Sequence, residues 1–401
     1  MSRIVVIGAG QAGASLTGKL RALGYEGEIV LIGEEPAPPY QRPPLSKKYL
    51  LGEMPIERMY LKPKAAYGEA GITLRTGTRV HAVDTNAREV HIGDEKLSYD
   101  ELAFTTGSVV RTLPQKIGGT LEGVFTVRTL ADVDAMAQAF AKGGHVLIIG
   151  GGYIGLEAAA VAAMKGLKTT LIEAADRILA RVAAPETSDY FRALHTEHGV
   201  DIREGVRLER LTGEGHVSGA ELSDGTALDI DFAIVGVGID PCTALASQAG
   251  IACENGIRTD ARGRTSAPHV WAAGDCASFP YRGTRIRLES VPNAMDQADV
   301  IAANMLGAEE DYLAKPWFWS DQYDVKLQIA GLNSGYDRVV VRHGEKGQSN
   351  WYYRGSELLA VDAMNDARGY MIGKRLIEAG KSPSPDAIAD PATDLKALLK
   401  A

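Results

Sequence analysis

Cysteine is scarce in this chain, which has only Cys242, Cys253 and Cys276 among its 401 residues. The three form no C-x-x-C pair and have no metal-ligating residues clustered around them, so no metal site is expected. Their odd number suits a reducing compartment. They are also too few, and wrongly spaced, to hold an iron–sulfur cluster, so the chain is not expected to carry one itself.

An excess of basic charge, a long apolar run and a cleavable leader are also missing. The net charge is −8, which argues against nucleic-acid binding because that function needs a basic face. No apolar run reaches the length of about 18 residues that spans a membrane. The chain opens on a strand-like segment, not on a charged stretch before an apolar one. With 45% hydrophobic and 23% charged residues, the composition predicts a cytoplasmic globular enzyme of two or three domains.

Glycine, by contrast, is abundant: 45 of 401 residues, or about 11%, against a usual value of about 7%. The segments RIVVIGAGQAGASLT (3–17) and HVLIIGGGYIGLEAA (145–159) both read as a strand, a G-x-G-x-x-G loop and a helix. In such a loop the first glycine allows a tight turn, the second admits a pyrophosphate, and the third lets helix and strand pack closely. These glycines are Gly8, Gly10 and Gly13 in the first loop, and Gly150, Gly152 and Gly155 in the second.

An acidic residue ends the strand that follows each loop. Glu34 lies 21 residues after Gly13, and Glu173 lies 18 residues after Gly155. A carboxylate at this place can accept hydrogen bonds from the ribose hydroxyls of an adenosine, and it repels a 2′-phosphate. The pattern therefore predicts two dinucleotides, with NADH preferred over NADPH at Glu173. Two dinucleotides in one enzyme are typical of electron transfer between a nicotinamide and a flavin.

The chain resembles the two-dinucleotide flavoprotein superfamily that includes glutathione reductase. A second FAD signature of that superfamily, T-x-x-x-x-hydrophobic-x-A-G-D, is matched by TSAPHVWAAGD from Thr265 to Asp275. The resemblance implies that Asp275 bonds a ribityl hydroxyl. A linker signature, A-T-G, stands here as Thr105-Thr106-Gly107, with the alanine replaced. The resemblance also implies that the FAD unit comes first and that the NAD unit is inserted into it.

Members that use thiols carry a cysteine pair, or a cysteine after the first βαβ unit, where this chain has Lys47 and no cysteine. The segments YQRPPLSKKYLLGE, GGGYIGLEAA, ESVPNAMDQA and PWFWSDQYDVKLQIAGL instead resemble a narrower family. These are the NADH-dependent ferredoxin reductases of bacterial oxygenase systems, of the putidaredoxin reductase, palustrisredoxin reductase and biphenyl dioxygenase reductase type. The resemblance extends over roughly residues 3–380.

On the flavin side, the resemblance places Arg42 and Lys47 facing the FAD, with Lys47 near the flavin N5. It implies that Ala12 and Val80 touch FAD through their main chains, and that Arg128 lies nearby. Val291 would begin a helix whose dipole stabilises charge at the flavin N1 and O2. Two structural alternatives stay open: Lys47 as a surface lysine and Arg128 as a solvated helix cap.

On the nicotinamide side, the resemblance implies that Tyr153 covers the pocket and that Glu157 binds the carboxamide. Gly238 would let the backbone approach the cofactor, and Trp319 would lie near the flavin on the exit route. We take Lys47, Glu157 and Trp319 as the catalytic candidates. The alternatives are an exposed helix glutamate for Glu157 and a core aromatic residue for Trp319.

The predicted function is a reductase that passes electrons from NADH through FAD to a small ferredoxin of the [2Fe–2S] kind, which serves an oxygenase such as a haem monooxygenase. A basic docking area for the ferredoxin is predicted from Arg282, Arg285, Arg287 and Lys326. An NADH:quinone or dye reductase, and a signalling flavoprotein like apoptosis-inducing factor, remain as alternatives. The predicted fold is α/β, with two Rossmann-like dinucleotide-binding domains and a C-terminal α+β domain. The predicted domains are 1–112 with 238–314 for FAD, 113–237 for NAD, and 315–401 at the C-terminus.

Overall fold

The computed structural model describes residues 2–344 and 347–400. The described chain separates into two units, each built from several segments. Unit 1 holds residues 1–41, 55–109 and 239–316, and unit 2 holds residues 42–54, 110–238 and 317–401. The segment 42–54, which contains the predicted flavin residues Arg42 and Lys47, thus belongs to unit 2. The three predicted domain boundaries stay a prediction.

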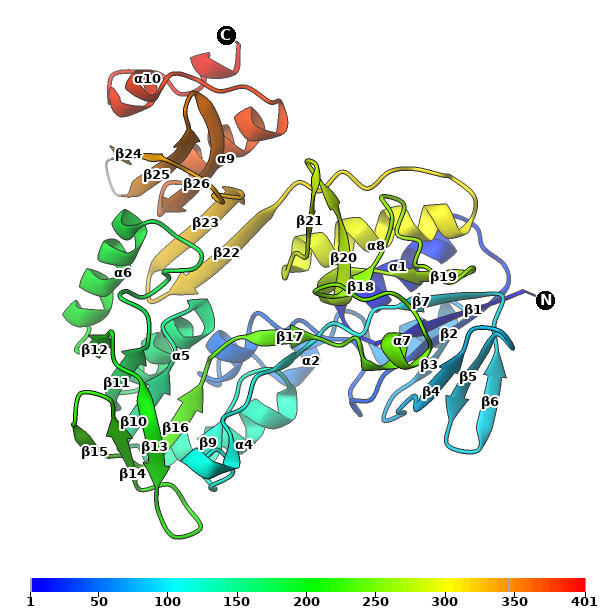
Figure 1. Ribbon diagram of the computed structural model, residues 1–401, viewed down its shortest axis with the longest axis horizontal. Helices are drawn as coiled ribbons and strands as arrows, with labels where there is room; N and C mark the ends of the chain where they lie inside the picture. The colour runs from blue at the N-terminus through cyan, green and yellow to red at the C-terminus, as the bar shows by residue number, and fades with distance from the viewer. Residues whose placement is uncertain (1, 345–346, 401) are drawn as a thin grey trace. The chain divides into compact units, whose positions relative to one another are not determined.

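Unit 1 is built around a five-stranded parallel sheet with the strand order β19-β7-β1-β2-β3. The helices α1 and α8 pack against each other on one face of this sheet (Figure 1). The three inner strands of this sheet are short runs of mostly apolar residues that are buried on both faces, as is typical of parallel sheets. The strands are β1 (Arg3–Ile7), β2 (Glu28–Ile32), β3 (Ile72–Arg75), β7 (Glu101–Phe104) and β19 (Val270–Ala272).

Smaller elements complete unit 1. Its helices are α1 (Gln11–Ala22), α2 (Ile56–Met59), α3 (Lys64–Glu69), α7 (Ala244–Gln248) and α8 (Val291–Met305), with a 3-10 turn, η3, at Gly274–Cys276. Two three-stranded sheets contain β4 (Ala82–Asp84), β5 (Glu89–Ile92) and β6 (Glu95–Ser98), and β18 (Ile257–Arg258), β20 (Ala277–Tyr281) and β21 (Thr284–Ile286). A two-stranded sheet pairs β8 (Ser108–Val110) with β17 (Ile239–Pro241).

Unit 2 repeats the parallel sheet, with the strand order β12-β11-β10-β16-β9. Its helix α5 reads YIGLEAAAVAAM and is buried over most of its surface, as an alanine-rich helix without a polar face should be. The strands are β9 (Val124–Phe125), β10 (His145–Ile149), β11 (Lys168–Glu173), β12 (Asp201–Glu204) and β16 (Phe232–Val235). Around them lie α4 (Leu130–Lys142), α5 (Tyr153–Met164), α6 (Pro185–Glu197), a 3-10 turn, η2 (Gln115–Ile117), and the antiparallel strands β13 (Leu208–Thr212), β14 (Gly219–Leu222) and β15 (Ala227–Asp229).

The C-terminal part of unit 2 is an antiparallel sheet with the order β22-β23-β26-β25-β24. Helix α9 packs on one face, and the opposite face bonds to α5 and α6 through Ser320 and Asp362. The elements are β22 (Trp317–Gln322), β23 (Val325–Gly331), β24 (Arg338–His343), β25 (Gln348–Arg354), β26 (Glu357–Met364), α9 (Ala367–Glu378) and α10 (Pro385–Ala389). The tail ends in a 3-10 turn, η4 (Ala397–Leu399), and not in the longer amphipathic helix that its sequence pattern suggests.

Residues 36–44, which contain five prolines, lead into a kinked helical turn, η1 (Leu45–Tyr49). Within this turn the backbone of Lys47 departs from helical values, with φ −134° and ψ −112°. The turn packs against α5, so it places its side chains beside the second glycine loop.

Candidate dinucleotide and redox site

The first glycine loop has the geometry that a dinucleotide requires. Gly8 turns the chain with φ +115°, and a Cβ there would lie 2.2 Å from the carbonyl oxygen of Thr105. A Cβ at Gly13 would lie 2.1 Å from the carbonyl oxygen of Gly8. A Cβ at Gly10, in contrast, would meet no described atom within 4 Å. Two glycines therefore serve close packing, while the middle one leaves the space that a pyrophosphate needs.

The second glycine loop repeats this arrangement in unit 2. Gly150 has φ +108°, and a Cβ there would lie 2.4 Å from the carbonyl oxygen of Gly236. A Cβ at Gly155 would lie 2.0 Å from the carbonyl oxygen of Gly150, whereas one at Gly152 would find no described atom within 4 Å. The residues present therefore fit a dinucleotide at both loops.

Small residues bring the remaining flavin candidates of unit 1 together at the starts of two helices. Gly274, with φ +79°, faces the start of α1, where its Cβ would lie 3.0 Å from that of Ala12. The next residue, Asp275, accepts a 2.9 Å hydrogen bond from the Ser108 hydroxyl. Val291 is the first residue of α8. Gly107 follows β7 with φ +66°.

The acidic residue of the first repeat points outward. Glu34 is 68% exposed and pairs with Arg79 at 3.2 Å. Val80, which follows Arg79 in the chain, has its side chain in the hydrophobic core, so only its main chain can face a ligand. Glu34 and Arg79 are accessible to a bound adenosine without any rearrangement of the core.

The acidic residue of the second repeat folds back onto the glycine loop. The Glu173 carboxylate accepts hydrogen bonds from the backbone N–H of Gly151 at 2.7 Å and of Ala175 at 2.8 Å. The nearby Arg177 donates to Ser188 and to the carbonyl of Ala183, so its guanidinium is bound to α6. A carboxylate that keeps two acceptor positions beside such a loop suits the ribose hydroxyls of NADH.

Lys47 and Glu157 form a buried ion pair in unit 2. Their side chains are only 15% and 2% exposed, and Lys47 Nζ lies 2.8 Å from Glu157 Oε1. Ser46 donates to Glu157 Oε2 at 2.6 Å, and Ser320 donates to Oε1 at 2.7 Å. Lys47 is therefore not a surface lysine, and Glu157 is not an exposed helix glutamate. A buried charge pair is stable only when its hydrogen bonds are satisfied, as they are here.

The other candidates of unit 2 are Arg42, Arg128, Tyr153 and Gly238. Arg42 donates to the carbonyl oxygen of Arg128, whose own N–H donates to Asp132 in the capping box of α4. The ring of Tyr153 packs against Phe318 with centroids 5.0 Å apart, and burial raises the pKa of its hydroxyl well above the usual value. Gly238 follows β16 with φ +109°.

Trp319 is half-buried on β22 and stacks on Trp317 at 5.6 Å. Alternation along the strand puts both tryptophans on the face opposite to Phe318 and Ser320, which contact α5. Both rings keep exposed surface, so neither lies in the core of the C-terminal sheet. The place of Trp319 near the flavin stays a prediction.

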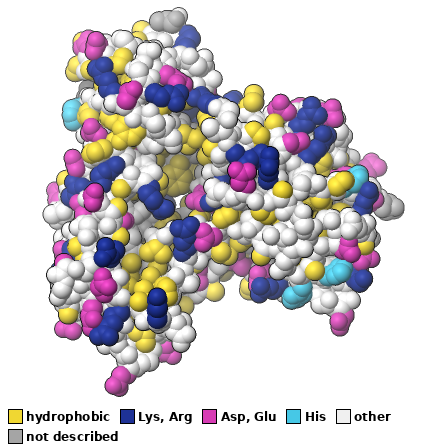
Figure 2. Space-filling view, in the orientation of Figure 1, with side chains coloured by type: hydrophobic (Ala, Val, Ile, Leu, Met, Phe, Trp, Pro, Cys, Tyr) yellow, Lys and Arg dark blue, Asp and Glu magenta, His cyan; other side chains and the backbone are white. Residues whose placement is uncertain are grey.

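The predicted basic docking area is wrong for two of its four residues. Arg285 donates to the carbonyls of Thr259 and Ser278, and Arg287 donates to that of Asp275 and pairs with Glu289. These two side chains are largely buried because backbone carbonyls bind them, whereas Arg282 and Lys326 are exposed. Figure 2 shows basic and acidic side chains interspersed over the visible face.

Several residues of the site escape the motif analysis. Ser46 and Ser320 stand within the quoted segments PPLSK and PWFWSDQ, but only their burial and contacts distinguish them from ordinary serines. Thr105 appears in the linker signature merely as a departure, yet its hydroxyl donates to the Gly8 carbonyl at 2.8 Å. A signal existed for Thr105, since a polar residue replaced the small one that the signature asks for.

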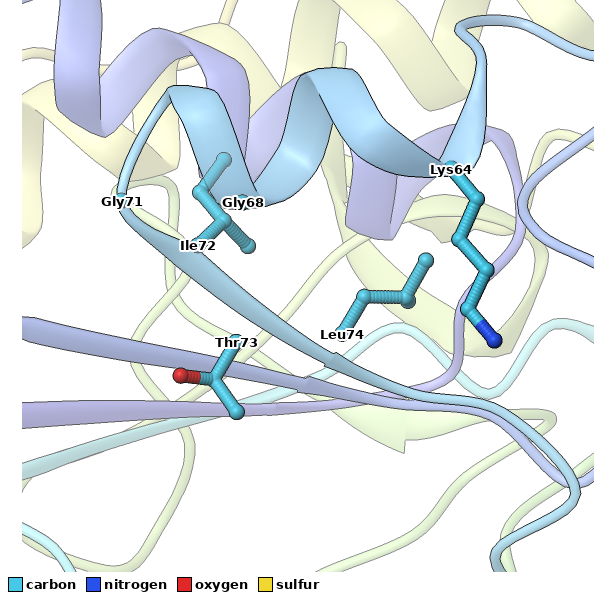
Figure 3. Close-up of a pocket in the computed structure, with 6 residues that line it drawn as sticks. All are labelled: Lys64, Gly68, Gly71, Ile72, Thr73 and Leu74. Carbon is cyan, nitrogen blue, oxygen red and sulfur yellow. The ribbon is translucent and has the colours of Figure 1, made fainter.

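A hollow of about 390 Å³ lies elsewhere, beside the edge strand β3 (Figure 3). Lys64 and Gly68 of α3 and the chain from Gly71 to Leu74 line it. It contains none of the predicted cofactor residues, so it is not the candidate site. Among residues 2–344 and 347–400, no three His, Cys, Asp or Glu side chains group as metal ligands would. No described helix is long and apolar enough to cross a membrane.

Two family models match the chain. Residues 2–298 match the pyridine nucleotide-disulphide oxidoreductase family, and residues 317–399 match the reductase C-terminal family. A ferredoxin–NAD(P)(+) reductase of Sphingomonas sp is 44% identical over 98% of this chain and 96% of its own. Putidaredoxin reductase of Pseudomonas putida is 39% identical over 99% and 97%.

Solved structures agree with these relatives. The covalent putidaredoxin reductase–putidaredoxin complex matches with a TM-score of 0.96 at 37% identity, over 100% of this chain and 98% of that one. The ferredoxin reductase for the CYP199A2 system of Rhodopseudomonas palustris matches with a TM-score of 0.95 at 38% identity, over 99% of each chain.

Two parallel sheets with open glycine loops and a C-terminal antiparallel sheet define a flavoprotein oxidoreductase with two dinucleotide sites. The chain belongs to the pyridine nucleotide-disulphide oxidoreductase family, in the branch of the ferredoxin reductases that carry a reductase C-terminal domain. The predicted fold class, family and enzyme class are confirmed, and for the predicted cofactors, FAD and NADH, the relatives support FAD and NAD(P)H.

Proposed function

We propose that this chain takes electrons from NADH and delivers them to a small iron–sulfur ferredoxin that serves an oxygenase. Bound FAD would accept a hydride and release the two electrons one at a time. The observation that carries the proposal is the pair of glycine loops, each with one open middle glycine. The similarity to putidaredoxin reductase and to the reductase of the CYP199A2 system supports a haem monooxygenase as the final acceptor.

The residues divide by the cofactor that they would hold. For FAD we propose Gly8, Gly10, Ala12, Gly13, Glu34, Arg42, Lys47, Val80, Gly107, Arg128, Asp275 and Val291. For NADH we propose Gly150, Gly152, Tyr153, Gly155, Glu157, Glu173 and Gly238. Trp319 stays a candidate for the exit route. A cytoplasmic location is part of the proposal, since few and unpaired cysteines suit that compartment.

The chain's own contribution is placement and charge. Lys47 would stabilise negative charge on the reduced flavin, and Glu157 would accept a hydrogen bond from the nicotinamide carboxamide. The start of α8 offers the backbone N–H of Val291 and a positive dipole end to an electron-rich ring edge, while Pro292 has no N–H and the Asn293 N–H donates to Ser290 Oγ. Glu173 would choose NADH by repelling the 2′-phosphate of NADPH.

The test is the absorbance of the purified protein under anaerobic conditions. A flavin spectrum that NADH bleaches, and that candidate ferredoxins restore one at a time, is the expected result. Reoxidation by quinones at a rate that no ferredoxin raises would instead favour a quinone or dye reductase. Slow bleaching with a lasting charge-transfer band would favour a signalling role, and a colourless protein that takes up no FAD would refute the proposal.

A further inference from the structure

Glu157 is the terminal acceptor of a buried hydrogen-bond network in unit 2. Its side chain is 2% exposed. Its two oxygens accept hydrogen bonds from the hydroxyls of Ser46 and Ser320, and one of them pairs with the ammonium of Lys47. The serines come from separate parts of the chain, η1 and β22, and reach a helix that lies between them in sequence. The two motifs PPLSK and PWFWSDQ therefore meet at one carboxylate.

The donors of this network point in one direction. Gln322 is 1% exposed and donates through Nε2 to the Ser320 oxygen at 3.2 Å, which leaves the Ser320 hydrogen for Glu157. The Gln322 carbonyl oxygen lies 2.8 Å from Nε2 of His195, so that ring nitrogen carries the proton. The other ring nitrogen of His195 then accepts from the Tyr323 hydroxyl at 3.2 Å.

A neutral imidazole fits this order of donors. His195 is fully buried, and burial lowers its pKa to about 4, so it holds one ring proton at neutral pH. Each hydroxyl or N–H from Tyr323 to Ser320 is thus aligned toward Glu157. Aligned hydrogen bonds in a low-dielectric interior polarise and strengthen one another.

A count of acceptor positions shows what remains for a ligand. A carboxylate has about four lone-pair sites. Glu157 Oε1 uses two of them for Ser320 and Lys47, and Oε2 uses one for Ser46. Within the described residues, one site on Oε2 is left to accept a further N–H. Because Ser46 occupies the other site of that oxygen, it fixes the direction in which the carboxylate can accept.

We infer that Ser46 and Ser320 are positioning residues, which hold the Glu157 carboxylate in place and aim its remaining acceptor site at the carboxamide of the nicotinamide. This inference rests on the proposed function, because it takes Glu157 as the residue that receives the carboxamide. The serines do not touch the cofactor and act through Glu157 alone. In this role, the serines explain why the segments PPLSK and PWFWSDQ both contact Glu157 of α5.

The experiment measures equilibrium binding to the oxidised FAD-loaded protein, without turnover. Two ligands are compared by titration calorimetry: the 1,4,5,6-tetrahydro analogue of NADH, which keeps the carboxamide but donates no hydride, and ADP-ribose, which lacks the nicotinamide. In S46A and S320A we expect the dissociation constant of the analogue to rise about 10-fold, as for a misplaced charged hydrogen bond. ADP-ribose binding should stay within about two-fold of wild type, and this also reports that the variant is folded.

Two comparisons separate positioning from general damage. In an E157Q background, adding S46A or S320A should change the affinity for the analogue less than two-fold, because the residue they act through is already altered. The control S349A removes another fully buried hydroxyl, which accepts from Trp351 Nε1, and should leave both ligands unaffected. Wild-type affinity for the analogue in both serine variants, or losses that persist undiminished with E157Q, would overturn the inference.

The failure of this inference differs from the failure of the proposed function. If NADH bleaches the wild-type flavin while the serine variants bind the analogue normally, the function stands and the positioning role is wrong. If wild-type protein takes up no FAD, or binds ADP-ribose and the analogue equally, the proposed function and its nicotinamide site both fail.

Discussion

The two βαβ repeats of this chain share a backbone and differ in what holds it. The glycines of the two loops match one by one. The middle glycines, Gly10 and Gly152, face open space, and the outer ones pack closely against backbone atoms: Gly8 and Gly13 in the first loop, Gly150 and Gly155 in the second. The likeness extends to the other end of the sheets. Asp100 accepts from the N–H of Arg3 at 2.6 Å, and Asp231 accepts from that of His145 at 2.7 Å, at the starts of β1 and β10.

The differences lie at the residues that contact each loop from the neighbouring strands. In unit 1 the loop meets Thr105, whose hydroxyl bonds the Gly8 carbonyl, whereas in unit 2 the same place is Gly236. In unit 2 the acidic residue, Glu173, bonds the loop amide of Gly151, whereas in unit 1 Glu34 turns outward to Arg79. One loop is therefore fixed at its first glycine by a hydroxyl, and the other at its second position by a carboxylate.

This contrast suits two ligands with different residence times. A hydroxyl on a buried carbonyl fixes the loop without occupying any ligand-binding atom, as a permanently bound cofactor allows. A carboxylate that bonds the loop and keeps acceptor positions for a ribose would link the shape of the loop to the presence of the ligand, as an exchanging cosubstrate requires. The shared backbone explains dinucleotide binding, and the second-layer contacts explain how each dinucleotide is held.

The largest expected effect breaks the shared part of the comparison. G13A and G155A each force a Cβ to about 2 Å from a backbone oxygen. We therefore expect the free energy of unfolding to fall by about 3 kcal/mol or more, and no dinucleotide to bind at the altered site. G10A and G152A should fold normally, and the affinity for the corresponding dinucleotide should fall about 10-fold, because the new Cβ enters only the space for the ligand. Urea unfolding measures the change in stability, and the absorbance of bound flavin measures how much FAD the variant holds. Equal destabilisation by G10A and G13A would contradict the assignment.

The next effect concerns the hydroxyl that only the first loop has. T105V keeps the shape of the side chain but removes the donor to the Gly8 carbonyl, so FAD affinity should fall about 5-fold, the worth of one buried hydrogen bond. T105S should restore it. At the matching place in unit 2, G236A should leave NADH binding unchanged, since its Cβ meets nothing closer than 3.6 Å. Flavin release followed by fluorescence gives the measurement, and unaltered release from T105V would remove the distinction.

A smaller effect tests the two acidic residues. E173Q keeps an acceptor for the Gly151 amide but loses the charge, so the preference for NADH over NADPH in kcat/KM should fall about 10-fold. E34Q, at an exposed residue, should change FAD affinity less than two-fold. If E173Q kept the full preference for NADH, cofactor choice would have to come from other residues, such as the exposed Arg181.

The sequence predicts this architecture well because its signals are local. An apolar strand, a glycine loop and a helix are adjacent in the chain, so β1–α1 and β10–α5 can be recognised without any tertiary contact. The meeting of Ser46 with Glu157 spans 111 residues and that of Ser320 with Glu157 spans 163, and no periodicity encodes such pairs. The docking prediction failed at Arg285 and Arg287 for the same reason, because the carbonyls that bind these two side chains cannot be seen in the sequence RGTRIR.

The smallest expected effect separates the two repeats by pH. His145 begins β10 and is buried, with its ring between the Asp229 carbonyl and the Thr170 hydroxyl, and burial lowers its pKa. Its folded form binds fewer protons than its unfolded form, so the stability it contributes is present above pH of about 6.5 and is lost as the pH falls below that value. The residue at the matching place on β1 is not a histidine but Arg3, which pairs with Glu28. Hydrogen exchange between pH 7.5 and 5.5, corrected for the intrinsic rate, should therefore show loosening of β10 but not of β1, and H145Q should abolish the difference. Equal loosening of both strands in H145Q and wild type would show that the two sheets respond to acid alike.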